Sequence, residues 1–569
     1  MMLGELPHRD FGELYTGGLA FLNAAAFRLL GANLWTLRLV LFASFLAWLP
    51  ALFYVASRFA RPLVAGAVVC LSVAWSLPVY PGAMASWYNL FLATIGAAFV
   101  LRFIEGGRPR WLFAAGVAGG LSFLVKVIGL YYIAAVLLFI VFHAQERARA
   151  NARRDAAGGR GYTIFVSLSM LLFCVALFMV VRSHLHPMEL IQFVAPGVLI
   201  ALLLARGEWA YAEGESRQRF TMLARLLGPF ALGAAIPVAL FLLRYLSAGA
   251  LQAWAHGVFV VPQRRLASIA VHALPPWTLL SLVPFVLLYA LGRRTARQWL
   301  GRRETVAIVI ALLLLLRATG GNGWLYRNVW FAARSLIPLL VITGVILLLR
   351  SRADDADDPL RRERTMLLLA VTAMCSLVQF PYTISVYFCY VAPLVPLLAL
   401  ALHRFDTMPS RTVPVLLLAF FAAFPVLRMH GTRIASIGES YQRSPPLAPL
   451  TMTRGGIMVS KRDAELYGTL VSELEAKARN GYTWASPDSP EVYFLSGLAN
   501  PTRTLFEVFD DSASQPDQVL QMLDARAVTA VVLSTPSFSP PISAELYALL
   551  SRRYPHAEYV GPFQLRWRD

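Results

Sequence analysis

Charged residues are scarce in this sequence, and acidic residues are scarcer than basic ones. Lys, Arg, Asp and Glu make up 15% of the 569 residues, with 51 basic against 32 acidic side chains. A soluble globular chain carries about 25% charged residues. The deficit lies in the first three quarters of the chain, where apolar runs near the length of a membrane-spanning helix follow one another. This composition excludes an ordinary soluble fold there, whereas residues 428–569 have the composition of a soluble domain.

Cysteine is also rare, and the four cysteines show no metal-ligand spacing. Cys70, Cys174, Cys375 and Cys389 all lie inside apolar runs, so we interpret them as small buried apolar residues and expect neither a disulfide framework nor a zinc site. The net charge of +19 would suggest a nucleic-acid partner in a soluble protein. Here the arginines lie in short loops between apolar runs, so membrane topology accounts for most of them, and we expect no nucleic-acid partner.

The apolar runs predict an all-α polytopic membrane protein followed by a small α/β domain. We expect three parts: an external loop with an interfacial helix at 1–33, a transmembrane domain at 34–427, and a soluble domain at 428–569. The transmembrane domain has about 14 candidate spans. They are 34–56, 64–80, 88–103, 112–126, 128–143, 162–181, 189–206, 227–246, 277–292, 304–317, 329–349, 366–381, 386–402 and 412–427.

The loop arginines predict the orientation of these spans. With the spans above, every arginine-rich loop falls on one side of the membrane, which the positive-inside rule makes cytoplasmic. The N-terminus and residues 428–569 are then external, which predicts a bacterial inner-membrane protein with a periplasmic C-terminal domain. This one-sided arrangement requires residues 112–143 to form two helices with a break near Lys126. A single helix there would place all earlier loops on the opposite side of the membrane from the later ones.

Carboxylates are few on the predicted external side. Before the C-terminal domain they are Glu5, Asp10, Glu13, Glu189 and Glu439. Asp10 and Glu13 share one short segment ahead of residues 17–31, whose helical spacing of apolar residues suits a helix lying in the membrane interface. Two carboxylates three residues apart are also common in solvated loops that cap a helix. Spacing alone therefore leaves open whether these carboxylates are catalytic or belong to a solvated surface loop.

Lys126 is isolated among apolar residues at the predicted external boundary. An ammonium at bilayer depth is costly unless it reaches the surface or finds an anion. Arg244, Arg327 and Arg334 flank the external ends of other spans. A cationic external surface with few acids suits an anionic lipid headgroup held by charge-assisted hydrogen bonds, although snorkelling to the surface explains Lys126 equally well.

The N-terminal residues resemble a known enzyme family. The segment from Gly4 to Phe11, followed by Glu13, Tyr15 and Gly18-Leu19, is similar to the first external loop of GT-C membrane glycosyltransferases. The group it resembles is glycosyltransferase family 39, which includes the protein mannosyltransferases and the aminoarabinose transferase of lipid A. The similarity extends over roughly residues 1–145, and its further elements are Phe27 to Leu34, Arg38-Leu39, Ser86 to Leu90, Arg110 to Leu112, Gly116, Gly119 to Leu121, Lys126 and Gly129.

The resemblance implies transfer of a sugar from a polyprenyl-phosphate carrier to a lipid, glycan or protein acceptor on the external face. It implies that Asp10 and Glu13 are catalytic. It also implies that Lys126, Arg9, Arg327 and Arg334 bind the donor phosphate, and that Tyr15, Trp87, Tyr88 and Asn89 bind substrate. No cofactor is expected, and no metal site is evident.

Two features depart from the family pattern. Family members have a first transmembrane helix and a leading acidic residue ahead of the segment that begins here at Gly4, so we expect the natural start to lie upstream, the alternative being a degenerate relative. Ser86 and Asn89 stand where a second family acid often lies. A polytopic transporter and a non-catalytic protein that binds the lipid carrier therefore remain alternatives, although no internal repeat of the kind found in transporters is visible.

The C-terminal region predicts alternating strands and helices. Helices are expected at 461–479, 516–525 and 544–554, and strands at 482–485, 491–495 and 530–533. The region shows no catalytic triad, metal cluster or phosphate-binding loop.

Overall fold

The computed structural model describes most of the chain, and the statements below concern these residues. They are 4–151, 160–210, 216–263, 275–283, 286–287, 302–319, 322–351, 358, 360–382, 384–405, 412–428, 446–505, 515–534 and 541–569.

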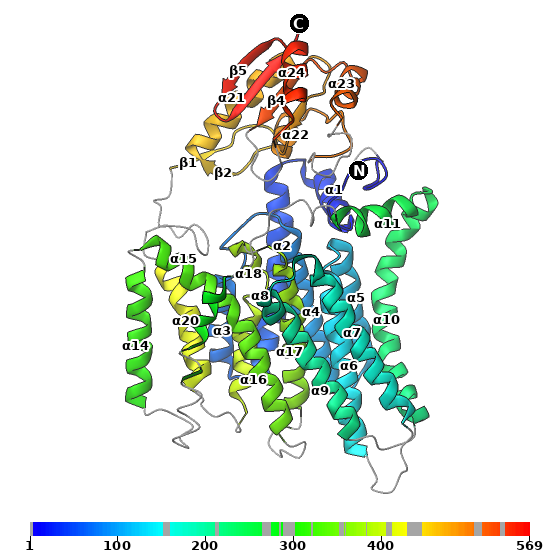
Figure 1. Ribbon diagram of the computed structural model, residues 1–569, viewed down its shortest axis with the longest axis vertical. Coiled ribbons are helices and arrows are strands. Elements are labelled where there is room, and N and C mark those ends of the chain that lie inside the picture. The colour runs from blue at the N-terminus through cyan, green and yellow to red at the C-terminus, as the bar shows by residue number, and fades with distance from the viewer. Residues whose placement is uncertain are drawn as a thin grey trace. The chain divides into compact units, whose positions relative to one another are not determined.

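The chain divides into two compact units, which we call the terminal unit and the helical unit. The terminal unit comprises Met1–Phe42, Phe241–Ala270 and Ser444–Asp569, and the helical unit comprises Ala43–Leu240 and Val271–Arg443. The helical unit is a bundle of helices, whereas the terminal unit contains the sheet together with α1 (Gly18–Leu30) and α11 (Leu251–Phe259) (Figure 1). The sequence did not predict that the N-terminal segment would share a unit with the C-terminal region.

Long apolar helices confirm a multi-pass, largely helical membrane protein. Among the described residues, 7 helical stretches are long and apolar enough to cross a membrane. Shorter apolar helices lie at several of the other predicted spans. The seven are Leu34–Ser57, Ala85–Gly106, Gly129–Arg149, Gly161–His184, Pro187–Ala210, Ser216–Ser247 and Asn328–Arg350.

Several predicted spans are composed of more than one helix. The predicted span 189–206 begins with a short α-helix and a π-helix, and the predicted span 386–402 is divided into two helices. The helices not yet given are α2 (Leu34–Ser57), α3 (Pro62–Ala74), α4 (Ala85–Gly106), α5 (Pro109–Val125), α6 (Gly129–Asn151), α7 (Gly161–Val181), η1 (Arg182–His184), α8 (Pro187–Glu189), η2 (Leu190–Val194), α9 (Ala195–Ala210), α10 (Ser216–Ser247), η3 (Pro276–Leu282), α14 (Arg302–Thr319), α15 (Gly323–Ala332), η4 (Ala333–Ser335), α16 (Leu336–Arg350), α17 (Arg361–Cys375), η5 (Ser376–Gln379), α18 (Ser385–Cys389), α19 (Leu394–His403) and α20 (Thr412–Arg428).

Helix α17 is the buried centre of the helical unit. It packs against α4, α6, α9, α16 and α19, and its residues from Thr365 to Met374 are buried on every side. Its first turn carries charged side chains that face α6: Arg362 lies 3.1 Å from Glu146, and Nδ1 of His143 lies 3.0 Å from Glu363. Buried charges persist in proteins when they are paired, so these pairs join α17 to α6 at the arginine-rich end of the bundle.

The predicted helix break near Lys126 is confirmed. Helix α5 ends at Val125, Lys126 has an extended backbone, and α6 begins at Gly129. A Cβ atom at Gly129 would lie 2.3 Å from backbone atoms of Ser122 and Phe123. Only glycine therefore allows α6 to begin so close to the last turn of α5.

Small residues bring α5 and α10 into backbone contact. A Cβ atom at Gly116 would lie 2.1 Å from the carbonyl oxygen of Phe230, and one at Gly120 would lie 2.3 Å from that of Ala234. Glycines four residues apart occupy one face of a helix, and such faces allow the close approach common between membrane helices. This contact positions the end of α5 that carries Lys126.

The C-terminal region is an α/β fold around one mixed sheet with strand order β3-β4-β6-β5. β3 and β4 are parallel, and the other pairs are antiparallel. Alternate residues of β4 enter different cores: Val531 and Leu533 pack with α23 and α24, whereas Ala530 and Val532 pack with α21 and α22. The elements are β1 (Leu447–Pro449), β2 (Met458–Ser460), α21 (Lys461–Lys477), β3 (Trp484–Ser486), α22 (Pro490–Ser496), α23 (Pro516–Ala525), β4 (Ala530–Ser534), α24 (Ala544–Arg553), β5 (His556–Val560) and β6 (Phe563–Trp567).

The structure corrects one predicted strand. Residues 491–495 form part of α22, which begins with Pro490 and is followed by Gly497, whose backbone is left-handed with φ 75°. Proline at the start and glycine after the end are the usual limits of a helix. The short apolar run fits a strand or a helix equally well, and only these flanking residues distinguish them. The sequence analysis also missed the hairpin of β5 and β6.

The orientation of the chain in the membrane stays a prediction and has a direct test. We expect alkaline phosphatase fused after Asp569 to be active in bacteria, and a β-galactosidase fusion at the same position to be inactive. The physical reason is the bias of short arginine-rich loops toward the cytoplasm. The opposite pair of activities would place the C-terminal region in the cytoplasm and refute the predicted topology.

Candidate functional site

The N-terminal loop is a compact turn closed by Asp10. The backbone N–H of Leu6 donates to Asp10 Oδ2 at 2.7 Å, and Arg9 donates from Nε and Nη2 to the two oxygens of the same carboxylate at 2.8 and 2.7 Å. These hydrogen bonds, with that from Arg9 the largest cause, hold the pKa of Asp10 below its usual value. Arg9 and Asp10, both predicted site residues, therefore neutralise each other in an ion pair.

The loop is attached to the rest of the terminal unit on two sides. Arg503 donates from Nη2 to the carbonyl oxygen of Arg9 at 2.6 Å, and the N–H of Gly12 donates to the carbonyl oxygen of Arg503 at 2.5 Å. Trp254 of α11 donates from Nε1 to the carbonyl oxygen of Thr16 at 3.0 Å. The loop is therefore part of a packed structure and is not a freely solvated segment.

Glu13 lies in this loop and differs from Asp10 in its surroundings. Its Oε1 accepts hydrogen bonds from the backbone N–H groups of Leu14 at 2.9 Å and Tyr15 at 3.2 Å. No ion pair joins Glu13 to any other described residue. Burial raises the pKa of Glu13, and the two backbone hydrogen bonds oppose this effect. A carboxyl group with a raised pKa is better suited to accept a proton near neutral pH than one paired with arginine.

His8 anchors the loop as a neutral ring. Its side chain is 7% exposed, its backbone has φ 65°, and its Nδ1 lies against α11 at Gly257, where a Cβ atom would be 2.1 Å away. Burial lowers the pKa of His8 to about 4. Protonation of this ring and docking of the loop therefore oppose each other.

We expect the backbone N–H groups of the N-terminal loop to exchange faster with solvent as the pH falls from 6.5 toward 4. A released His8 has its ordinary pKa of 6.5 and the docked one a pKa of about 4, so the released state binds more protons within this window. The free energy that favours the docked loop is therefore largest above pH 6.5 and falls on acidification, by about 3 kcal/mol at pH 4. Hydrogen exchange at the N–H groups of His8 and Gly12, corrected for intrinsic exchange, measures this. His8→Asn, which tolerates the same backbone conformation, should remove the pH dependence, and constant protection in the unaltered protein would contradict the prediction.

A second group of predicted site residues lies in the helical unit, at the break between α5 and α6. Lys126 donates from Nζ to Ser86 Oγ at 3.3 Å. Asn89, one turn further along α4, donates from Nδ2 to Ser122 Oγ at 2.7 Å and to the Ser122 carbonyl oxygen at 2.8 Å. The same carbonyl accepts from the backbone N–H of Lys126 at 3.2 Å. Ser86 and Asn89 thus hold the lysine at the end of α5.

Residues 380–382 and 384–390 connect this group to Arg334. The ring of Tyr390 packs edge-on against Trp87 of α4, with centroids 4.6 Å apart, and Arg334 of η4 donates from Nη2 to the carbonyl oxygen of Ile384. Phe380 at the start of the segment contacts Phe193 of η2, with centroids 5.8 Å apart. Segments distant in the sequence therefore meet at one end of the helical bundle, near α8, α15 and α18 (Figure 1).

Arg334 is a buried guanidinium group whose described partners carry no negative charge. It is 2% exposed, it donates to one carbonyl oxygen, and its Cζ lies 4.7 Å from the ring centroid of Phe331. No carboxylate among the described residues forms an ion pair with it. A buried charge without a counter-charge is costly, and a cation in this setting is suited to an anionic ligand.

The structure changes the interpretation of two predicted substrate contacts. Trp87 donates from Nε1 to the carbonyl oxygen of Tyr80, and Asn89 donates to Ser122. Because their donor groups are already bonded within the protein, we interpret both as residues that hold the ends of the helices, whereas the substrate contact of Tyr88 stays a prediction. Tyr15 is half-buried in the N-terminal loop. Arg327 lies in α15, and its side chain is outside the described part of the structure, as are Arg264, Arg265 and Glu439.

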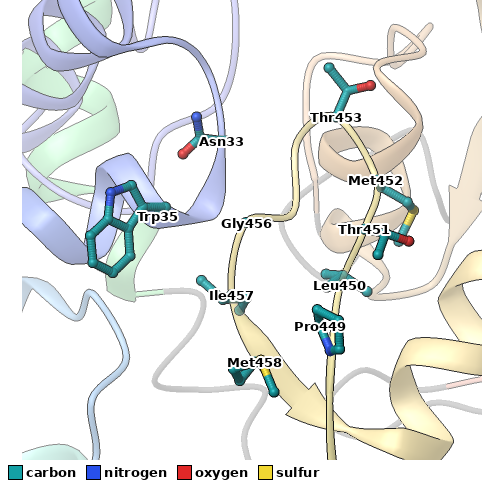
Figure 2. A pocket seen from close by; sticks show the side chains of 10 residues that line it. All are labelled: Asn33, Trp35, Pro449, Leu450, Thr451, Met452, Thr453, Gly456, Ile457 and Met458. Carbon is teal, nitrogen blue, oxygen red and sulfur yellow. The ribbon is translucent and has the colours of Figure 1, made fainter.

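A surface groove of about 660 Å³ lies in the terminal unit but has no lining residue suited to catalysis. Figure 2 shows Asn33 and Trp35 on one side and the loop between β1 and β2 on the other. Asn33 is occupied by capping α2, because its Oδ1 accepts from the N–H of Thr36 at 2.8 Å. The lining residues are Asn33, Trp35, Pro449, Leu450, Thr451, Met452, Thr453, Gly456, Ile457 and Met458.

Three buried polar residues at the end of the bundle that carries Arg334 were not predicted as site residues. They are Glu189, Gln192 and Ser335, with exposed fractions of 4%, 3% and 0%. The available signal was the scarcity of external carboxylates, among which Glu189 stands alone between the first loop and residue 439. Among the described residues, no group of three His, Cys, Asp or Glu side chains is placed to hold a metal ion.

Comparison of the chain with family models, curated proteins and solved structures finds no match. The function is therefore argued from the residues and geometry given above.

Proposed function

We propose that this chain is a membrane glycosyltransferase that moves a sugar from a polyprenyl-phosphate donor to a hydroxyl group of an acceptor on the external face. The observation that carries the proposal is the buried cation Arg334, which has no carboxylate partner among the described residues and lies in the contact network that includes Lys126. Guanidinium and ammonium groups bind phosphate through charge-assisted hydrogen bonds. The resemblance of the N-terminal segment to family 39 supplies the reaction class.

In the proposed reaction the acceptor oxygen attacks the anomeric carbon of the sugar. The bond between that carbon and the phosphate oxygen breaks, and polyprenyl phosphate leaves with the electron pair. The resemblance to family 39 implies that an acid of the N-terminal loop takes up the proton of the acceptor hydroxyl, and the raised pKa of Glu13 favours that residue over Asp10. Arg334 and Lys126 stabilise the negative charge that develops on the leaving phosphate.

Asp10 and Arg9 have a different role in this proposal. Their ion pair closes the turn that contains Glu13, and the same carboxylate accepts from the N–H of Leu6. Asp10 is therefore proposed as a positioning residue. The bidentate pair engages the guanidinium group of Arg9, so Arg9 is not proposed as a phosphate-binding residue.

The proposal is tested by incubating the purified protein in lipid nanodiscs with a panel of polyprenyl-phosphate hexoses and pentoses. Release of polyprenyl phosphate together with glycosylation of an added membrane extract is the expected result. Binding of the donor without release would identify a non-catalytic carrier-binding protein. Movement of the intact donor across the bilayer of proteoliposomes would instead identify a transporter.

We expect Lys126→Met to weaken binding of polyprenyl phosphate by roughly tenfold or more, because a charge-assisted contact contributes about 1.5–3 kcal/mol. The substitution keeps the length and apolar character of the side chain and removes the charge. Titration of the lipid into nanodiscs, followed by intrinsic tryptophan fluorescence, measures the dissociation constant. Unchanged affinity would show that Lys126 reaches the membrane surface without touching the lipid phosphate.

A further inference from the structure

Glu189 is a buried carboxyl group near the start of the apolar stretch Pro187–Ala210. It is 4% exposed, and its Oε2 has no hydrogen-bond partner among the described residues. No described cation forms an ion pair with it. Burial of such a group without a partner opposes folding. A buried carboxyl group without a partner in the described part of the chain therefore points to a ligand.

The backbone that carries Glu189 is irregular. Glu189 ends the short helix α8, and the π-helix η2 (Leu190–Val194) follows before α9 begins at Ala195. π-Helical turns are rare and occur frequently at functional sites, because the inserted residue changes the direction of the neighbouring side chains. Gln192 lies in this π-helix, and its side chain reaches Ser335 of η4.

A hydrogen bond joins η2, which directly follows Glu189 in the chain, to η4. Gln192 donates from Nε2 to Ser335 Oγ at 2.7 Å, and both side chains are buried. Glu189 precedes Gln192 by three residues, and η2 directly follows the end of α8 at Glu189. Ser335 directly follows Arg334, the proposed phosphate-binding residue. A carboxyl, an amide, a hydroxyl and a guanidinium group are thus grouped at this end of the bundle.

Aromatic rings border the same group. Phe193, next to Gln192, packs against Phe380, and the ring of His184 lies 6.2 Å from that of Phe380. Phe331 lies under the guanidinium of Arg334. Apolar and aromatic side chains beside a few polar groups are the usual composition of small-molecule sites.

We infer that Glu189, with Gln192 and Ser335, binds hydroxyl groups of the donor sugar whose phosphate is held by Arg334. The carboxylate accepts hydrogen bonds from the sugar hydroxyls, and the amide oxygen of Gln192 accepts another while its Nε2 remains bonded to Ser335. This inference rests on the proposed function and adds to it the residues that distinguish the sugar-bearing lipid from the lipid phosphate alone. Glu189 bonds to the sugar and takes no part in the proton transfer.

The test compares two lipids and two variants. The lipids are polyprenyl phosphate and whichever polyprenyl-phosphate glucose, mannose, galactose or arabinose the unaltered protein binds most tightly. We expect Glu189→Gln to weaken binding of the sugar-bearing lipid by tenfold or more and to leave the affinity for polyprenyl phosphate unchanged. Arg334→Met should weaken binding of both lipids. Glu465→Gln, at a side chain that is 68% exposed on α21, is the matched control and should change neither affinity.

Two outcomes would overturn the role of Glu189 while leaving the proposed function intact. One is equal affinity of Glu189→Gln and the unaltered protein for the sugar-bearing lipid. The other is a change of the same size for both lipids, which would mean that Glu189 acts on Arg334 and not on the sugar. An unaltered protein that binds neither lipid would instead refute the proposed function itself.

Thermal unfolding without lipid provides a second measurement. A carboxyl group that serves a ligand is expected to destabilise the empty protein, so Glu189→Gln should unfold at a higher temperature than the unaltered protein. A lower unfolding temperature would show that Glu189 stabilises the fold and would count against the inference. Glu465→Gln should leave the unfolding temperature unchanged.

Discussion

Replacement of Glu13 by Gln is expected to lower the turnover number by roughly 100- to 10,000-fold, the usual contribution of a general base. The substitution preserves the size of the side chain, and the amide oxygen can still accept from the N–H groups of Leu14 and Tyr15. It removes the ability to take up the proton of the acceptor. Donor binding, measured with polyprenyl phosphate, should be retained.

The pH profile adds a second criterion for Glu13. A base acts when it is deprotonated, so activity should fall as the pH drops through its pKa. Because burial raises the pKa of Glu13, the acidic limb of kcat/KM should lie above the ordinary glutamate value of 4.5. The corresponding limb should be absent from the residual activity of Glu13→Gln.

Asp10→Asn is the informative comparison for this result. It breaks the ion pair with Arg9 and weakens the bond from the Leu6 N–H, so the turn that holds Glu13 should loosen. We expect a smaller loss of turnover than for Glu13→Gln, accompanied by faster hydrogen exchange in residues 6–16. Turnover of Glu13→Gln at the rate of the unaltered protein would show that the loop is a structural element and that the base lies elsewhere.

Replacement of Arg334 by Met should weaken binding of polyprenyl phosphate by roughly tenfold to more than a hundredfold. A charge-assisted hydrogen bond contributes about 1.5–3 kcal/mol, and each 1.4 kcal/mol corresponds to a factor of ten in affinity. Arg334→Lys should retain part of the affinity, because an ammonium attracts phosphate but lacks the planar fork of donors. The measurement is the dissociation constant in nanodiscs.

A matched substitution at the other end of the same helix controls for general effects. Arg350 is an exposed arginine at the end of α16, whereas Arg334 is buried immediately before its start. Arg350→Met should leave lipid affinity unchanged. If Arg334→Met also binds polyprenyl phosphate with unchanged affinity, the buried guanidinium supports the backbone of residues 384–390 only, through its bond to Ile384.

Much of the architecture follows from the sequence because the membrane strongly restricts a chain. Backbone groups in hydrocarbon must be paired within the segment, so long apolar runs become helices. The break near Lys126 was predictable because a single helix over residues 112–143 would have moved the earlier arginine-rich loops to the opposite side of the membrane. The structure adds that Gly129 allows the tight turn. In the C-terminal region the long amphipathic helices were predictable, whereas residues 491–495 were too short for their pattern to separate a helix from a strand.

The chemical properties of the site residues were decided by tertiary structure. Asp10 and Glu13 are equivalent in sequence, yet one is paired with Arg9 and the other has its pKa raised by burial. Trp87 resembled a substrate contact and is fully enclosed by neighbouring helices. Glu189 and Arg334 are 145 residues apart in the chain, and no local pattern indicates that the bond between Gln192 and Ser335 brings their segments together. Local sequence determines which segments are helical, whereas burial, pairing and pKa depend on contacts between segments that are remote along the chain.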